Sequence, residues 1–142
     1  MGKFGMGQSV PRTEDPRLLT GRGRYVSDTA LGGQVFGYTV RSPHAHAHIR
    51  SIDTGAAKAA PGILAVYTHE DVVAQGLGRT QVHFPPRTRP DGAPDYDRPH
   101  PGLVGDTVRC IGDPVAFVVA ETSNLAKDAA EMVVVDYDIL PV

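Results

Sequence analysis

Tryptophan is absent from this 142-residue chain, cysteine occurs once, and aromatic residues make up only 6% of it. The scarcity of aromatic side chains argues against binding of single-stranded nucleic acid, which depends on base stacking. Cys110 alone can form neither an internal disulfide nor a Cys-x-x-Cys metal or redox motif. A single thiol fits a reducing compartment, so we expect a cytoplasmic protein.

An excess of one charge and long apolar runs are also lacking. The net charge is −2 and the basic residues are scattered, which argues against a nucleic-acid footprint and against a polybasic membrane patch. No apolar run approaches the roughly 18 residues of a membrane-spanning helix, and no signal-peptide core is visible. The length fits one domain, and the glycine and proline content stays below that of disordered chains.

Hydrophobic periodicity over residues 34–142 predicts a mixed α+β domain in which strands and short helices alternate. The expected strands are 34–41, 47–53, 63–67, 107–111, 114–120 and 134–139. The expected helices are 54–60, 69–75, and a third that runs from a cap at Thr122 or Ser123 to about Val133. The nearly unbroken apolar run 114–120 predicts a strand buried on both faces, and 63–67 predicts a short buried strand.

Two segments lack this regularity. Residues 1–33, rich in glycine and arginine, are expected to form an irregular docking leader, with one short strand at Arg24–Ser27. Residues 77–103 hold six of the twelve prolines and show no periodicity. A loop this long within a compact domain is usually functional or disordered, so we expect a surface excursion that contacts a partner.

The alternating histidines His44, His46 and His48 are the most prominent candidate for a metal site. Residues two apart share one face of a strand, so three imidazoles could hold zinc, copper or nickel. Against this, same-face neighbours on one strand stand about 7 Å apart and converge poorly on one ion. The alternative is three hydrogen-bonding side chains near the turn that follows Pro43.

The leader carries two glycine pairs and four arginines. Neither Gly5-Met6-Gly7 nor Gly21-Arg22-Gly23 completes a phosphate-binding motif, so both are expected to be flexible turns. The arginines either contact a partner's carboxylates or a phosphate, or form a solvated basic face. They are Arg12, Arg17, Arg22 and Arg24. Glu14 and Asp15 are expected to form weak local ion pairs.

No catalytic constellation stands out among the remaining residues. Cys110 falls in an expected strand and is interpreted as a small core side chain. Asp136 and Asp138 share one face of the last strand, where they are expected to be exposed, and Asp113 fits a Gly-Asp-Pro turn. The residues alone therefore predict a globular domain with no catalytic, cofactor-binding or metal-binding residue.

Four motifs follow one another along the chain: Pro11–Asp28, Val40–Asp53, Ala59–Asp71 and Val108–Leu140. In this order they resemble the opening of the large subunit of molybdenum hydroxylases, the family of xanthine dehydrogenase, aldehyde oxidase and aerobic carbon monoxide dehydrogenase. The leader at Phe4–Gln8 looks most like the carbon monoxide dehydrogenase branch. The resemblance implies the family's α/β hammerhead fold, and it makes the histidine cluster an ordinary family pattern in which relatives often carry arginine at position 48.

The resemblance also implies an activity for the complete enzyme. Such enzymes hydroxylate an aldehyde or N-heterocycle, or oxidise carbon monoxide, at a molybdenum–pterin cofactor, and electrons leave through two [2Fe–2S] clusters, often to FAD. The family's catalytic glutamate and most cofactor contacts lie in a larger domain that follows. This chain would then be a structural and assembly domain, not catalytic alone, and either a fragment or a separate subunit.

The implied partners are a molybdenum-cofactor domain or chain, an iron–sulfur subunit and, in many members, a flavin subunit. The leader and the proline-rich loop are expected to supply the contacts. The residues chosen for this role are Arg12, Arg17, Arg22, Arg24, Tyr25 and Asp28. The competing hypothesis is a free-standing binding or assembly module that holds a small ligand, or a metal through His44, His46 and His48.

Overall fold

The computed structural model describes residues 11–78, 80, 89–93 and 100–142 of the chain. The chain divides into two compact units, Met1–Gln34 and Val35–Val142.

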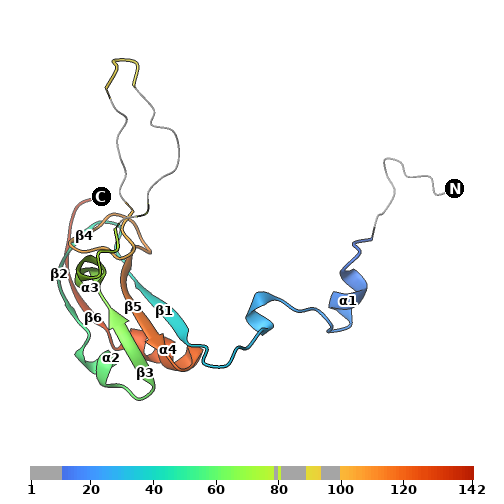
Figure 1. The fold of residues 1–142 in the computed structure, drawn as a ribbon. Coiled ribbons are helices and arrows are strands. Elements are labelled where there is room, and N and C mark those ends of the chain that lie inside the picture. Colours follow the sequence, from blue (N-terminus) through green and yellow to red (C-terminus); the bar gives the residue numbers. More distant parts are fainter. Residues whose placement is uncertain (1–10, 79, 81–88, 94–99) are drawn as a thin grey trace. The chain divides into compact units, whose positions relative to one another are not determined.

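The larger unit contains two three-stranded antiparallel sheets with short helices between their strands (Figure 1). One sheet has the order β1 (Phe36–Arg41), β5 (Pro114–Ala120) and β3 (Ile63–Tyr67). The other has the order β4 (Thr107–Val108), β2 (Ala47–Asp53) and β6 (Val134–Ile139). The helices are α2 (Gly55–Ala59), α3 (His69–Ala74) and α4 (Ser123–Glu131). The predicted mixture of strands and short helices is therefore confirmed.

The middle strand of the first sheet, β5, is buried as expected. Val115, Ala116 and Val118 are fully buried because β5 has a neighbouring strand on each side and side chains packed on both faces. Strand β3 has the expected bounds but lies at the edge of this sheet, where Val66 is buried and Leu64 is 54% exposed. The expectation of a buried strand was wrong here, because a short apolar run does not reveal how many neighbours a strand has.

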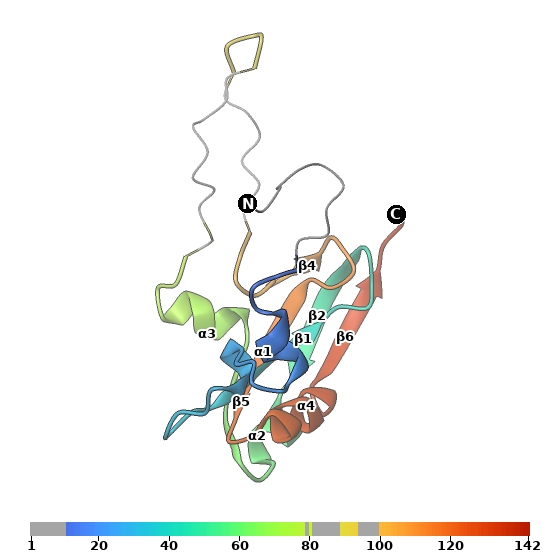
Figure 2. The ribbon, with the colours of Figure 1, turned by 90° about the vertical axis from the view of Figure 1, so that its right-hand side faces the viewer.

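Helix α4 begins where its cap allows. The hydroxyl of Thr122 accepts a hydrogen bond from the Leu125 N–H at 3.2 Å, so Thr122 and not Ser123 is the N-cap. Ala126, Ala129 and Ala130 are buried, and the helix packs against β1 and β5. It lies beside α2 at one end of the strands (Figure 2). The helix ends at Glu131, two residues earlier than expected, because its last turn tightens into i to i+3 bonds.

The core consists of two clusters that share neighbours. The larger cluster lies between the β1-β5-β3 sheet and helices α2 and α4; the smaller one lies by the β4-β2-β6 sheet. The larger contains Ala57, Val66, Ala116, Val118, Ala129, Ala130 and Val133, and the smaller contains Ala47, Val104, Val108 and Val115. The partly buried side chains of Val40 and Val135 pack against both clusters, so they join the two sheets.

The expected strand 107–111 is much shorter in the structure. Strand β4 ends at Val108, and Cys110 is exposed, so its interpretation as a core side chain was wrong. The carboxylate of Asp113 accepts hydrogen bonds from the N–H groups of Arg109 at 2.7 Å and Cys110 at 3.2 Å. These amides therefore bond a side chain in a turn and are not available to a sheet partner.

The described residues of the smaller unit, which includes the expected leader, form helix α1 (Asp15–Leu19) and the 3₁₀ turn η1 (Val26–Asp28) (Figure 1). The strand expected at Arg24–Ser27 was wrong. The Tyr25 N–H donates to the Asp28 carboxylate at 2.9 Å, which turns the chain back on itself before a strand can form. Neither α1 nor η1 has a buried residue.

Candidate functional site: the leader

The glycine pair after α1 closes the helix in a Schellman motif. The Gly21 N–H donates to the Leu18 carbonyl at 3.1 Å, and the Arg22 N–H donates to the Arg17 carbonyl at 2.9 Å. Gly21 has a φ of +68°, the left-handed conformation that this motif requires and that glycine adopts without strain. The expected turn is therefore present at Gly21, its flexibility stays a prediction, and Gly5–Gly7 lies outside the described residues.

Two further contacts define the shape of the leader. The Thr20 hydroxyl donates to the Pro16 carbonyl at 2.7 Å, which satisfies one of the free carbonyls of the short helix. A Cβ at Gly23 would lie 2.6 Å from the Leu18 Cδ2, so glycine lets the chain pass close over the Leu18 side chain. The backbone of residues 15–28 is thus held by local hydrogen bonds and one close contact, without a core.

The six residues predicted to contact a partner divide into two groups in the structure. Arg17 pairs with Glu14 at 2.9 Å and Arg12 with Asp15 at 3.8 Å, so the expected local ion pairs are present. Asp28 bonds the Tyr25 backbone. In contrast, the guanidinium groups of Arg22 and Arg24 make no hydrogen bond or ion pair with any residue in the described ranges; both residues are exposed. The structure does not bring the six side chains together into one cluster.

Sequence reasoning missed the apolar side chains of the leader. Leu19, Val26 and Leu31 are 86%, 94% and 71% exposed, although large aliphatic side chains are usually buried in a folded domain. Residues 1–33 show no apolar periodicity that could have indicated these side chains.

The three histidines do not converge. The His44 ring packs edge-on against Tyr137, with 4.9 Å between ring centroids. His46 donates from Nδ1 to the Pro141 carbonyl at 2.8 Å, and the Nδ1 of His48 lies 3.0 Å from the Thr107 hydroxyl. Only His48 lies in β2, so the alternation along one strand that the metal hypothesis assumed is missing. In the described part of the chain no group of three His, Cys, Asp or Glu side chains could hold a metal ion.

Asp113 and Cys110 form a polar cluster in the turn between β4 and β5. The Cys110 thiol donates to the Asp113 carboxylate at 2.8 Å. This hydrogen bond, with smaller contributions from desolvation and from the carboxylate charge, raises the pKa of the thiol. Burial would raise the pKa of Asp113, but the hydrogen bonds from Cys110 and Arg109 outweigh it, and the pKa of Asp113 is lowered. A thiol with a raised pKa is a poor nucleophile at neutral pH, so this cluster is structural.

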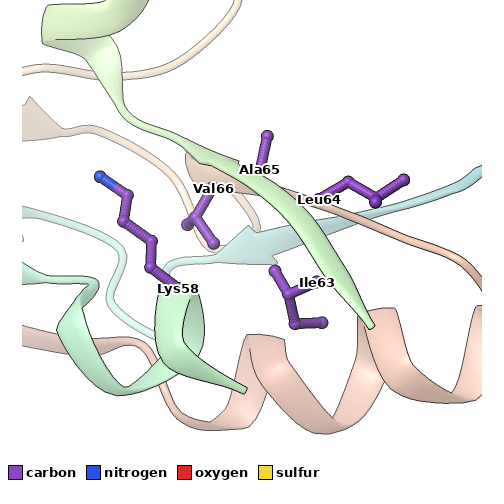
Figure 3. A pocket seen from close by; sticks show the side chains of 5 residues that line it. All are labelled: Lys58, Ile63, Leu64, Ala65 and Val66. Carbon is purple, nitrogen blue, oxygen red and sulfur yellow. The ribbon is translucent and has the colours of Figure 1, made fainter. Parts of the chain in front are cut away.

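A shallow recess of about 260 Å³ lies along β3 (Figure 3). Its lining residues are Lys58, Ile63, Leu64, Ala65 and Val66. The register with β5 shifts between Ile63 and Ala65, so Ile63 and Val66 extend to the same side of the strand (Figure 3). A bulge and a nearby lysine are features that protect an edge strand from unwanted pairing. The recess is smaller than typical ligand pockets, and we do not assign it a ligand.

Residues at both ends of the expected loop 77–103 form hydrogen bonds within the larger unit. His69 donates from Nδ1 to the Leu103 carbonyl at 2.8 Å, and Thr80 pairs with His100 across the loop. The His69 ring lies so close to Gly105 that a Cβ there would meet it at 2.4 Å. Most of the loop (79, 81–88 and 94–99) lies outside the described residues, so its expected role as a partner contact stays a prediction.

Comparison with known proteins identifies the family. A family model described as "Aldehyde oxidase and xanthine dehydrogenase, a/b hammerhead domain" matches residues 20–141. The chain belongs to this family. The α/β hammerhead fold expected from the sequence motifs is therefore confirmed, and it corresponds to the larger unit together with the end of the leader.

The relatives of this hammerhead domain are much longer proteins. It is 41% identical to the nicotine 6-hydroxylase large subunit of Paenarthrobacter nicotinovorans, over 96% of this chain and 16% of the relative. It is 44% identical to the carbon monoxide dehydrogenase large chain of Afipia carboxidovorans, over 97% of this chain and 16% of the relative. The crystal structure of quinoline 2-oxidoreductase from Pseudomonas putida 86 superposes with a TM-score of 0.78 at 38% identity, over 95% of this chain and 16% of that one. The chain thus spans about a sixth of the length of these relatives.

The residues of the hammerhead domain do not fit the cofactors that the family resemblance implies. A [2Fe–2S] cluster takes four thiolate or imidazole ligands. The chain has one cysteine, and its described residues contain no cluster of three His, Cys, Asp or Glu side chains that could hold a metal ion. The recess along β3 is too small and shallow for a pterin or a flavin. No helix in the described ranges is long and apolar enough to cross a membrane.

Proposed function

We propose that this chain is the structural and assembly domain of a molybdopterin-dependent oxidoreductase and is not catalytic by itself. In the complete enzyme, the reaction is hydroxylation of an aldehyde or an N-heterocycle, or oxidation of carbon monoxide. The names of the relatives support this range, because they include a nicotine hydroxylase, a quinoline oxidoreductase and a carbon monoxide dehydrogenase.

One observation carries the proposal. The match to the hammerhead family extends over residues 20–141, yet nearly the whole chain aligns with only 16% of the length of the relatives. The described residues of the chain offer no ligand set for a metal. The chemistry therefore belongs to the remaining five-sixths of such an enzyme, and the hammerhead domain supplies packing surfaces for it.

The molybdenum–pterin cofactor, the [2Fe–2S] clusters and FAD would be held by other parts of the enzyme. One relative is named a molybdenum-binding subunit, and one solved structure is a Cu,Mo-CO dehydrogenase. We propose as partners a molybdenum-cofactor domain or chain, an iron–sulfur subunit and a flavin subunit, assembled in the cytoplasm. The proposed contact residues of the leader are Arg12, Arg17, Arg22, Arg24, Tyr25 and Asp28.

The test is isolation of the protein from its source cell with an affinity tag, followed by metal analysis and mass spectrometry. We expect molybdenum and iron to co-purify with the hammerhead domain and with a much larger cofactor-bearing region. Xanthine, nicotine, quinoline and carbon monoxide, with an artificial electron acceptor, then test the reaction. A monomer that carries neither molybdenum nor iron would overturn the proposal and favour the free-standing binding module.

A further inference from the structure

The histidine motif lies beside the end of strand β6, and two of its members contact that strand or the residues after it. The His44 ring packs edge-on against Tyr137, with 4.9 Å between the ring centroids. The His46 backbone carbonyl accepts the Leu140 N–H at 3.0 Å, and its Nδ1 donates to the Pro141 carbonyl at 2.8 Å. The turn between β1 and β2 is therefore joined to the chain that leaves β6 beside β2 (Figure 2).

The backbone pairing of β2 with β6 ends at Ala47 and Ile139. Pro141 follows two residues later and has no N–H with which to extend the pairing. Its carbonyl is nevertheless bonded, because the His46 ring supplies a donor. Residues near a chain end are usually poorly ordered unless a contact ties them down. The His46 side chain thus attaches the chain two residues beyond the last pair of the sheet.

The turn that carries His44 and His46 is itself held at its base. Ser42 is 2% exposed, its hydroxyl accepts the His44 N–H at 3.0 Å, and its backbone N–H donates to the Asp113 carbonyl at 2.9 Å. A contact made from a fixed turn costs less conformational entropy than one made from a loose loop. His46 is therefore already in place to hold the Pro141 carbonyl.

The acceptor determines where the proton of the His46 ring lies. A carbonyl oxygen only accepts hydrogen bonds, so Nδ1 must carry a proton, and in the neutral ring Nε2 is then unprotonated. His48 differs, because its Nδ1 faces the Thr107 hydroxyl of β4 at 3.0 Å, and a hydroxyl can donate or accept. His48 therefore offers a comparison within the same motif.

We propose that His46 is a clamp on the end of the domain: its Nδ1–H tautomer holds Pro141 and sets the direction in which the chain leaves β6. The clamp gives the histidine motif a conformational role in place of the metal-binding role that its spacing suggested. It depends on contacts within the larger unit alone, so it does not depend on the proposed function.

Substitutions of His46 in the full-length protein test the clamp and the tautomer together. In asparagine the amide nitrogen is as many bonds from Cβ as Nδ1 is, whereas in glutamine it is one bond further, as Nε2 is. His46→Asn should therefore keep the bond, and His46→Gln and His46→Ala should lose it. The measurement is amide hydrogen exchange at Leu140, followed by mass spectrometry with electron-transfer fragmentation. Exchange should become about 5-fold faster in the Gln and Ala variants, the factor expected for one net hydrogen bond, and less than ~2-fold faster in His46→Asn.

Two references separate the clamp from general stability. The control His48→Ala removes an imidazole of the same motif that bonds β4, and it should leave Leu140 exchange unchanged. The Val118 amide in β5 should keep its protection in every variant. Unchanged exchange at Leu140 in His46→Ala would overturn the clamp, and so would an equal acceleration at Leu140 and Val118. If His46→Gln preserves protection as well as His46→Asn does, the assignment of the Nδ1–H tautomer is wrong.

Discussion

A single carboxylate, that of Asp113, determines how the chain leaves β4. It accepts the Arg109 and Cys110 amides and the Cys110 thiol, so three donors converge on one side chain. Asp113 also lies directly before β5, because this strand begins at Pro114. At the scale of single residues, the turn is therefore both the end of one sheet and the beginning of the other.

The first prediction concerns the reactivity of Cys110. Because the Asp113 hydrogen bond raises the pKa of the thiol, the exposed side chain should react slowly with iodoacetamide at pH 7.5 despite its accessibility. Asp113→Asn removes the negative charge beside the sulfur and should increase the alkylation rate several-fold. The rate constant is measured by mass spectrometry from pH 6 to pH 10, with Asp106→Asn as the matched control. An unchanged pH profile in Asp113→Asn would contradict the assignment.

The second prediction concerns stability in acid. The pKa of Asp113 is lowered in the folded state, and so is that of Asp71, chiefly through its hydrogen bond from the Thr68 amide. A depressed carboxylate pKa stabilises the fold above the unfolded pKa of about 3.9, and this stabilisation is lost as pH falls toward the folded value. Asp113→Asn should therefore lower Tm at pH 7, by about 4 °C if one net hydrogen bond of about 1 kcal/mol is lost.

The control for this measurement is the acid limb of the same curve. As the pH falls through the lowered pKa of Asp113, the Tm values of Asp113→Asn and the unmodified protein should converge, because the carboxyl group then becomes protonated in the folded state as well as in the unfolded state. Asp71→Asn should behave in the same way. Tm curves that stay parallel through the whole acid transition of the unmodified protein would show that the Asp113 charge does not contribute.

At the scale of elements, the hydroxyl of Thr122 determines where helix α4 begins. Both Thr122 and Ser123 are good capping residues, but only Thr122 has the extended backbone and the hydrogen bond to the Leu125 amide. The alanines behind the cap are small enough for the helix to lie close against β1 and β5. Close packing on strand β1 also depends on a small residue. Gly37 leaves room for the ring of Phe117, because a Cβ at position 37 would lie 2.3 Å from this ring.

The third prediction tests this cap. Thr122→Ala should destabilise the domain by about 1 kcal/mol, because it leaves an amide of the first turn without an acceptor. Ser123→Ala, one residue further along, should change the free energy of unfolding by less than ~0.5 kcal/mol. Urea unfolding followed by circular dichroism measures both. Equal losses in the two variants would mean that the helix begins at a different residue.

At the scale of the whole molecule, the larger unit behaves as one body because its two core clusters share side chains. Val40 from β1 and Val135 from β6 pack against both clusters, although each sheet has its own hydrogen bonds. Loss of either valine should therefore weaken the two sheets together.

The fourth prediction follows from this sharing. Val135→Ala should lower the free energy of unfolding by about 2 kcal/mol, since it removes two methyl groups that pack against both core clusters. Val134→Ala, on the same strand but 65% exposed, is the matched control and should cost less than ~0.5 kcal/mol. Near-ultraviolet and far-ultraviolet circular dichroism in urea should give coincident transitions for Val135→Ala. Two separated transitions would show that the sheets unfold independently.

The type and the bounds of most elements were determined by the sequence itself. Strands β2, β3, β5 and β6 have the predicted ends. The signals that predict them, the alternation of side chains and the glycine and proline residues near the ends, are local in the sequence. The order of the four motifs was likewise sufficient for the hammerhead family, which the comparison with known proteins confirmed. The predicted division into a leader and a domain, and the predicted contact residues, stay predictions.

Only the tertiary structure decided which strand is central, which residues the histidines bond, and which leader arginines form ion pairs within the described residues. His46 and His48 bond residues that lie 95 and 59 positions away in the chain, and nothing near them in the sequence indicates these partners. Strand β3 lies at an edge because of its pairing with β5 alone, which an apolar run cannot reveal. In the leader, Asp15 and Glu14 pair with Arg12 and Arg17, whereas Arg22 and Arg24 form no ion pair within the described ranges.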